Sequence, residues 1–445
     1  MNLYHAAEAI FKEAVQSVHP EKLIRAAVSV VDGYLHIGAK KFPLSSLNRI
    51  YVVGAGKASA GMAKPLEEIL GDLISEGLIA VKYGHELPLN KIKQVPAAHP
   101  VPDEKGAAAA TEIHRLLNRT GEQDLVICLW SGGASALLAD YPAGIDLADL
   151  QAVSDHLLRS GAAIGEINTV RKHLSTLKGG QFARCAWPAQ VVSLIISDVV
   201  GDDPATIASG PSVPDTGTFQ DALQIVRRYF PAASDGNFFS RRILDHLEKG
   251  SRGLLAETPK PGDPVFEKVS HFIIGSNEIA LAAAAAKAEQ LGFFTRLLGT
   301  RAEGPAEEIA SFLATHALSH RAPWPACLLL GGESTVEVRA EGKGGRNQHL
   351  ALAAALALEA RGNAGAVALS AGTDGTDGPT DMAGAVAGSA TLEKARGMGL
   401  DPQDFLARCD SYRFFEQVGG HVYTGPTQTN VMDLMLVMLP GKQKE

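Results

Sequence analysis

Three polar loops between positions 331 and 381 hold the residues of this chain that are best suited to chemistry. They read GGEST from position 331, GKGGRNQ from position 342 and SAGTDGTDGPTD from position 370. Glycine permits close backbone approach, so its amides and a neighbouring cation can surround an anion. Turn formation is the alternative, but turns alone would not need several such loops in series. We therefore expect a ligand site in this region.

The elements expected around these loops put their charged side chains at helix and strand ends. The alanine- and leucine-rich run 349–359 predicts a helix, with Arg346 at its N-terminus. The run 366–370 predicts a buried strand, and Asp374 and Asp377 follow its carboxyl end. Ligands collect at that edge of an open α/β sheet. Because one or two carboxylates and substrate phosphates usually hold Mg²⁺, we expect phosphate with Mg²⁺ on Asp374 and Asp377.

A second glycine turn lies near the N-terminus. The apolar strand expected at 49–53 runs into Gly54, Gly56 and Lys57, and a helix follows. A glycine turn at a helix start is an anion site. It is not a Walker A loop because alanine follows Lys57, and serine at the third glycine position departs from the dinucleotide fingerprint. A positive charge is unfavourable at the N-terminus of a helix, so a structural role for Lys57 is poorly motivated. We therefore expect Lys57 to have a functional role.

A third turn of this kind follows the apolar strand expected at 125–130. Its sequence SGGAS offers backbone amides and the hydroxyls of Ser131 and Ser135 around Gly132 and Gly133. From these residues alone, a tight turn with a capping serine is an equally good interpretation.

Two further groups of charged residues are candidates. Arg171, Ser175 and Lys178 can share one helical face, which would bind phosphate or carboxylate, although such runs are as often solvated helix sides. After the strand expected at 191–196, Asp198 stands nearest the strand end and could orient a substrate hydroxyl or hold a metal.

Composition excludes several classes of protein. A chain of 445 residues with 46% hydrophobic and 20% charged residues is typical of a globular protein with two domains. Its net charge of −8 argues against a nucleic-acid partner. The four cysteines are spaced singly, so neither a zinc site nor a disulfide framework is indicated. The N-terminal run is amphipathic and the alanine run near position 283 is too short for a bilayer, which favours a cytoplasmic protein.

Strand and helix patterns alternate along the chain and indicate two non-identical α/β/α domains with mainly parallel sheets. We expect an N-terminal Rossmann-like domain over residues 1–240 and a C-terminal α/β domain over residues 265–445. The proline- and glycine-rich stretch 231–264 is expected to link them.

Several sequence blocks, in the expected order, together resemble a known family: the glycerate 2-kinases whose C-terminal part is called the MOFRL domain, about residues 325–435 here. Two positions depart from the family pattern, with Gln428 in place of glycine and Met432 in place of a polar residue. The blocks are VVGAGKAS (52–59), LWSGGASALL (129–138), INTVRKHLSTLKGG (167–180), ISDVVGDDPATIASGPSVPD (196–215), the three polar loops and TGPTQTNVMDL (424–434).

The resemblance implies transfer of the γ-phosphoryl group of ATP to the 2-hydroxyl of D-glycerate, giving 2-phosphoglycerate, in the cleft between the domains. Lys57 and Arg346 would neutralise the phosphoryl group or hold the glycerate carboxylate, and Asp198 would orient the hydroxyl. ATP and Mg²⁺ are the expected cosubstrate and metal. Residues expected to bind substrate or nucleotide are Gly54, Gly56, Ser131, Gly132, Gly133, Ser135, Arg171, Gly332, Glu333, Gly344, Gly345 and Asn347.

Two other functions stay open at this point. One is an NAD(P)H-dependent hydroxypyruvate reductase, against which the missing third glycine and the missing ribose-binding carboxylate weigh. The other is a non-catalytic protein that binds a nucleotide or a sugar acid. The expected partners are small molecules, with neither nucleic acid nor membrane, and homodimer formation is left open.

Overall fold

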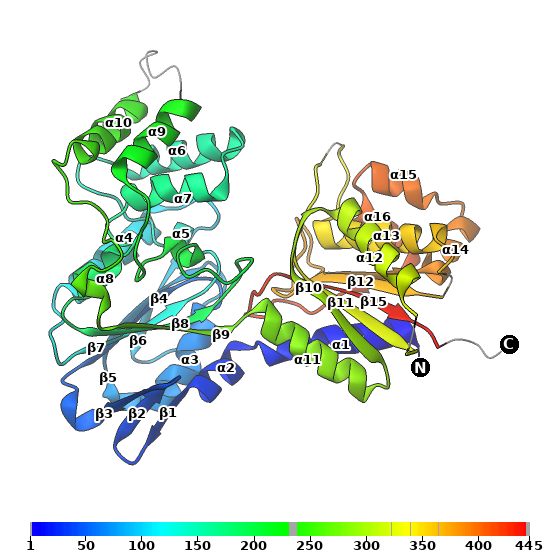
Figure 1. The fold of residues 1–445 in the computed structure, drawn as a ribbon, viewed down its shortest axis with the longest axis horizontal. Coiled ribbons are helices and arrows are strands. Elements are labelled where there is room, and N and C mark those ends of the chain that lie inside the picture. The colour runs from blue at the N-terminus through cyan, green and yellow to red at the C-terminus, as the bar shows by residue number, and fades with distance from the viewer. Residues whose placement is uncertain (1, 231–237, 322, 339, 364, 442–445) are drawn as a thin grey trace. The chain divides into compact units, whose positions relative to one another are not determined.

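The computed structural model describes residues 2–230, 238–321, 323–338, 340–363 and 365–441 (Figure 1). They form two compact α/β units, in agreement with the predicted fold class. The parallel-sheet unit comprises residues 23–196 and 202–274. The mixed-sheet unit comprises the first 22 residues, residues 197–201 and the chain from Gly275 onward. In the described part of the chain, no helix has both the length and the apolar character needed to cross a membrane.

A six-stranded sheet is the centre of the parallel-sheet unit. Its strands are β4 (Ile50–Ala55), β5 (Ile74–Lys82), β6 (Ile92–Ala97), β7 (Leu125–Trp130), β8 (Gln190–Ile196) and β9 (Val269–Gly275). They lie in the order β6-β5-β4-β7-β8-β9, and all neighbours from β6 to β8 run parallel, as predicted. β4 and β7 are buried along their whole length, as apolar strands in a parallel sheet between helices must be.

Further helices and a small antiparallel sheet complete this unit (Figure 1). The helices are α2 (Pro20–Ala27), α3 (Ser59–Leu70), α4 (Glu104–Leu117), α5 (Ala134–Leu137) and α8 (Gln181–Ala186), with single 3₁₀ turns at Leu44–Ser46, Gly71–Leu73, Ile207–Ser209 and Pro264–Phe266. The small sheet joins β1 (Val28–Val31), β2 (Tyr34–Ile37) and β3 (Lys40–Pro43).

Four helices form a layer with a core of its own. They are α6 (Leu147–Arg159), α7 (Ile164–His173), α9 (Phe219–Tyr229) and α10 (Phe238–Ser251). Their apolar faces meet around Val153, Val170, Phe219 and Leu247. The layer therefore includes α10, although the surrounding stretch 231–264 was expected to link two domains. Residues 231–237 of that stretch lie outside the described residues.

The mixed-sheet unit has a second six-stranded sheet. It contains β10 (Phe294–Pro305), β11 (Ala326–Thr335), β12 (Val367–Gly372), β13 (Gly384–Gly388), β14 (His421–Val422) and β15 (Asp433–Leu439), in the order β10-β11-β15-β12-β13-β14. Only β10 and β11 are parallel, whereas the sequence was expected to give a mainly parallel sheet. The reason is that the last strand, β15, inserts antiparallel between β11 and β12, and no helix joins β12 to β13.

Helices cover both faces of this mixed sheet (Figure 1). α1 (Leu3–Ser17) and α11 (Asn277–Gln290) pack together on one face. On the other face α12 (Ala306–Ser319) and α13 (Arg346–Ala360) share a core with Leu328, Leu330 and Met435 of the sheet. A second cluster on the far side of α13 holds α14 (Ser389–Gly397), α15 (Pro402–Ala407) and α16 (Ser411–Val418).

The chain crosses between the units at places other than those expected. β9, expected to open the second domain, is a strand of the parallel-sheet unit's sheet. The N-terminal helix, expected in the first domain, belongs to the mixed-sheet unit: the Tyr4 hydroxyl lies 3.1 Å from the Thr391 hydroxyl, and Thr429 donates to the Val18 carbonyl at 2.8 Å. Periodicity reveals the buried face of a helix but not which sheet that face will cover.

Candidate active site

The loops after β4 and β7 interlock at the carboxyl edge of the parallel sheet. The Lys57 amide donates to the Gly132 carbonyl at 2.9 Å, and the Ala58 amide donates to the Ser131 hydroxyl at 3.0 Å. Gly56 has φ 136°, and a Cβ there would lie 2.1 Å from the Ser131 Oγ. Two loops that the sequence predicted separately are thus one structure. Gly54, by contrast, is needed for strand packing, since its Cβ would lie 2.4 Å from the Leu129 carbonyl oxygen.

A histidine that the sequence did not single out as functional lies against this pair of loops. The His99 ring is 2.9 Å from where a Cβ on Gly133 would stand, and Gly133 has φ 86°. Burial, and then the nearby charge of Lys57, lower the pKa of His99 to about 4. His99 is therefore neutral near pH 7, and the charge of this edge comes from lysine.

Ser135 belongs to a chain of hydroxyl and amide groups. Its hydroxyl lies 2.9 Å from that of Ser209, which donates to the Asn168 side chain at 3.2 Å. Ala208 and Ser209 have φ of 53° and 59°, a conformation that costs energy for residues other than glycine and is often found at functional sites. Ser209 was present in a recognised block, ASGP, but its backbone conformation was not predictable from that motif.

The basic cluster near residue 171 does not share one helical face. α7 ends at His173, so Ser175 and Lys178 lie in the following loop. There Lys178 donates to Asp140 at 2.5 Å and to the Leu138 carbonyl at 2.6 Å. Among the residues that the structure describes, none forms a hydrogen bond or ion pair with the Arg171 side chain, and burial lowers the pKa of its guanidinium. The cluster therefore contains one neutralised lysine and one arginine without a carboxylate partner.

In the mixed-sheet unit, Arg346 is the first residue of α13 and is held by two carboxylates. Its Nε and Nη2 donate to Asp433 at 2.7 and 3.0 Å, and its Nη1 donates to Glu333 at 2.5 Å. Asp433 is fully buried at the start of β15. Burial acts to lower the pKa of Arg346, but Asp433 and Glu333 outweigh it and hold that pKa above its ordinary value. Two N–H groups, one on each Nη, remain for a ligand.

The glycines around Arg346 are required by close contacts. A Cβ on Gly332, which has φ 147°, would lie 2.0 Å from the Ala302 carbonyl oxygen of β10. On Gly344 it would lie 2.4 Å from the Ser411 hydroxyl, and on Gly345 it would lie 2.3 Å from the Asp377 carboxylate. Gly344 and Gly345 therefore also shape the start of α13, whereas Gly332 lets β11 approach β10 closely.

The two predicted metal ligands have different environments. The Asp377 carboxylate is buried and accepts hydrogen bonds from the amides of Asn347 and Gln348 at 3.0 and 2.8 Å, and from both side chains. It therefore caps α13, and burial, followed by the charge of Asp433, raises its pKa to about 6. Asp374 is half-buried and accepts from Thr376 at 3.0 Å. The described residues contain no group of three His, Cys, Asp or Glu that could hold a metal.

Asp198 lies with the mixed-sheet unit, although it follows β8. Asn430, which the sequence did not single out, donates to its carboxylate at 3.3 Å. The loop that carries Asn430 has Gln428 at φ 61° and Met432 at φ 70°. The left-handed conformation favours glycine or asparagine, which gives the two departures from the family pattern a physical meaning: this chain has larger side chains at strained positions.

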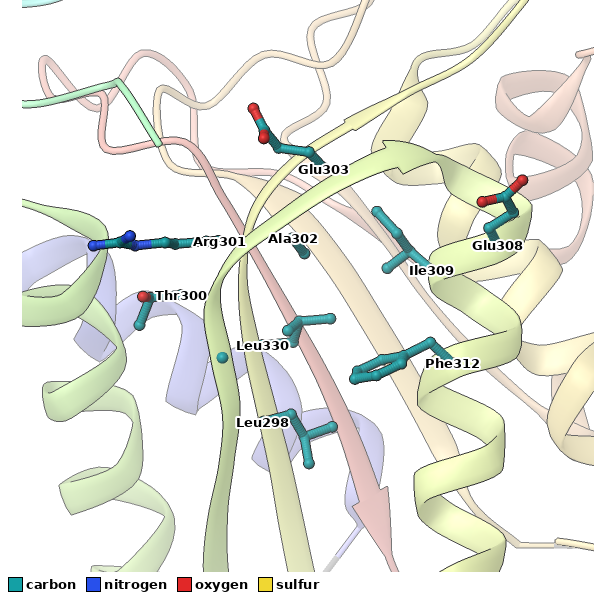
Figure 2. Close-up of a pocket in the computed structure, with 10 residues that line it drawn as sticks. Leu298, Thr300, Arg301, Ala302, Glu303, Glu308, Ile309, Phe312 and Leu330 are labelled. Carbon is teal, nitrogen blue, oxygen red and sulfur yellow. The ribbon is translucent and has the colours of Figure 1, made fainter. Parts of the chain in front are cut away.

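Not every hollow of the structure belongs to these loops. Figure 2 shows a hollow of about 680 Å³ between β10 and α12, with Leu298, Leu330, Ile309 and Phe312 pointing into it. None of the predicted site residues lines it. A hollow of about 450 Å³ in the parallel-sheet unit is lined by Ser135 and Arg171, two of the predicted binding residues.

The strand-end loops with cations and carboxylates define an α/β protein built to bind small anionic ligands. Family models match residues 6–236, as a domain of unknown function called DUF4147, and residues 326–433, as the MOFRL family. The chain is 39% identical to a glycerate 2-kinase of Pyrococcus horikoshii over 97% of this chain and 96% of that protein. An Agrobacterium vitis relative, 42% identical over 94% and 93% of the two chains, is named only provisionally as a hydroxypyruvate reductase.

A solved structure supports the same relationship. The crystal structure of a glycerate kinase from Thermotoga maritima matches with a TM-score of 0.84 at 36% identity, covering 98% of this chain and 99% of that one. The chain belongs to the MOFRL family of glycerate kinases.

Proposed function

We propose that this protein is a glycerate 2-kinase, which transfers the γ-phosphoryl group of ATP to the 2-hydroxyl of D-glycerate and releases 2-phosphoglycerate and ADP. The observation that carries the proposal is the 39% identity with a glycerate 2-kinase over nearly the whole of both chains. The interlocked glycine loops at Lys57 and the paired guanidinium of Arg346 support it, because phosphoryl transfer depends on positioning and charge neutralisation more than on covalent chemistry. The proposed setting is the cytoplasm.

Arg346 is assigned to an anionic oxygen of the phosphoryl group or of the glycerate carboxylate. Its orientation is fixed by Asp433 and Glu333 before any ligand arrives, so little side-chain entropy is lost on binding. Asp433 is thus a positioning residue that acts through Arg346. Lys57 is assigned to the same chemistry from the glycine turn after β4, where it supplies charge beside a neutral His99.

ATP and Mg²⁺ remain the proposed cosubstrate and metal. When bound, Mg²⁺ would neutralise charge on the nucleotide phosphates. Asp374 is the carboxylate proposed to approach it, while Asp377 holds the start of α13 through its capping hydrogen bonds. Asp198, held by Asn430, is proposed to orient the glycerate hydroxyl.

The test incubates the full chain with D-glycerate, ATP and Mg²⁺ and identifies the product by phosphorus NMR, which separates a phosphate on the secondary hydroxyl from one on the primary hydroxyl. A parallel incubation holds hydroxypyruvate and NADH. Formation of 2-phosphoglycerate without NADH oxidation is the expected result. NADH oxidation without phosphoryl transfer would establish the reductase instead. If neither reaction occurs, the non-catalytic binding protein is the function that is left.

A further inference from the structure

The hollow at Arg171 lies entirely within the parallel-sheet unit. Its walls come from α5, α6, the end of α7 and residues 100–102, and its volume is about 450 Å³. This lies in the range of sites for small organic ligands, which are usually concave and mostly apolar. The Gln151 side chain donates to the Pro102 carbonyl at 2.6 Å and so joins two of the walls. The hollow is therefore formed without a ligand.

Most of its lining is apolar. Ten of the seventeen lining residues are proline, alanine, valine or leucine. Two of these, Val101 and Leu158, are 60% and 58% exposed. Apolar side chains exposed beside a hollow gain free energy when a ligand covers them. A three-carbon hydroxy acid has almost no apolar surface for this purpose, whereas a purine base has two apolar faces.

The polar part of the hollow holds two cations, Arg171 and Lys178, and two carboxylates, Asp140 and Asp155. Asp155 is paired with Arg159 at 2.9 Å. Lys178 is neutralised by Asp140, which also accepts from the Thr176 and Leu177 amides and so fixes this loop. Arg171 lines the same hollow and has no partner in the described part of the chain. A half-buried guanidinium without a counter-ion is costly unless a ligand supplies the anion. The hollow thus combines an apolar wall with one unmatched positive charge.

We propose that this hollow binds the nucleotide of the kinase reaction, with the base against the apolar wall and a phosphate at Arg171. The proposal rests on the proposed function and deepens it, because it assigns the nucleotide to the parallel-sheet unit. Neither the glycine loops nor the family resemblance makes that choice. The Gln151 Nε2 donates to the Pro102 carbonyl, and its amide oxygen is the group proposed to meet the edge of the base.

Calorimetric titration of the full chain with ADP and with adenosine tests the two halves of the site. Arg171→Ala should weaken ADP by about tenfold to a hundredfold, the loss expected for a charged hydrogen bond, and leave adenosine unchanged. Ala152→Phe, which fills the apolar part, should weaken both ligands. Arg115→Ala and Ala108→Phe change equivalent residue types on the exposed side of α4 and should change neither. In steady-state assays the KM for ATP should rise in both hollow variants while the KM for D-glycerate stays constant.

The proposal would be overturned if an Arg171→Ala variant with the melting temperature of the unsubstituted protein bound ADP with unchanged affinity. A rise in the KM for D-glycerate alone would assign the hollow to the acid and would also overturn it. If Ala152→Phe does not fold, Ala148→Phe at the exposed rim replaces it. ADP binding that depends on Arg171 in a protein without glycerate kinase activity would retain the nucleotide site and reject the proposed reaction. If the protein has glycerate kinase activity but the variants leave ADP binding unchanged, the proposed reaction is retained and the nucleotide site is rejected.

Discussion

The two units treat their half-buried arginines in opposite ways. Arg346 in the mixed-sheet unit is enclosed by Asp433 and Glu333, and its pKa is held above the ordinary value despite burial. Arg171 in the parallel-sheet unit has no such partner in the described chain, and burial alone lowers its pKa. The difference teaches that a paired arginine serves the fold as well as a ligand, whereas an arginine without a partner serves mainly a ligand.

The largest effect is expected in the parallel-sheet unit, at Lys57. Lys57→Ala should lower kcat by roughly a hundredfold to a thousandfold, the range for loss of one charge-stabilising donor in a closed site. Thermal unfolding should be unchanged, and Lys64→Ala on the exposed side of α3 is the matched control. Near-native turnover in Lys57→Ala would remove this residue from the mechanism.

Arg346 should show losses in both stability and activity. Arg346→Ala leaves buried Asp433 without its partner, which we expect to cost about 3 kcal/mol of unfolding free energy, below the upper range because Arg346 is one-third exposed. Arg346→Lys should be nearly as inactive as Arg346→Ala, since lysine cannot reproduce the two parallel bonds to Asp433. Denaturant unfolding and kcat measure the two losses. Full activity with lysine would mean that only the charge matters.

Asp377 should make the mixed-sheet unit sensitive to pH. Its folded pKa of about 6 lies above the ordinary value, so the folded state favours the protonated form. The stability that this carboxyl contributes is present in acid and declines as pH rises from about 4 to 6. Relative to Asp377→Asn, the unfolding free energy of the unsubstituted protein should fall by on the order of 3 kcal/mol across that window. A constant difference would mean that the cap keeps Asp377 ionised throughout.

The metal requirement separates the two aspartates. Asp374→Asn should raise the Mg²⁺ concentration for half-maximal activity several-fold, because a neutral amide is a weaker ligand than a carboxylate. Asp377→Asn should change that concentration less, since its carboxylate is engaged by α13. Removing Mg²⁺ with a chelator should abolish activity reversibly. Equal shifts in the two variants would restore the pair as joint ligands.

The smallest effect on folding is expected at Arg171. Because Arg171 has no carboxylate to leave unpaired, Arg171→Ala should change the unfolding free energy by less than about 0.5 kcal/mol. Denaturant unfolding beside Arg346→Ala makes the comparison direct. A loss as large as that of Arg346→Ala would reveal a structural role and weaken the contrast between the units.

Local order along the chain was predictable from the sequence, and long-range pairing was not. The apolar runs at 50–53, 78–81 and 125–130 became β4, β5 and β7, and the run at 349–359 became α13, because burial pattern and helix propensity are local properties. The glycine turns after β4 and β7 were correctly expected at strand ends. GGEST, expected as a loop, instead forms the last five residues of β11. The Arg346–Asp433 pair joins residues 87 positions apart, and no local pattern announces it.

The elements that the sequence predicted wrongly are also those that long-range contacts decide. α7 ended at His173, so one helical face could not hold both Arg171 and Lys178. The alternation of apolar runs did not reveal that β15 would enter the middle of its sheet and reverse the local strand direction. β9 and α1 bury apolar surface equally well against either sheet as far as periodicity can tell. Tertiary contacts decide such cases.

The position of β15 has a consequence for protein synthesis. This strand, Asp433–Leu439, lies between β11 and β12 and is the last strand among the described residues. Domains tend to fold in order as they leave the ribosome, and the parallel-sheet unit is complete once β9 has emerged. The mixed-sheet unit must instead wait until residues 433–439 have been made, although α1, β11 and β12 are made earlier. A ribosome that stops before residue 433 would thus release a chain with one finished unit and one in which β11 and β12 are not bridged.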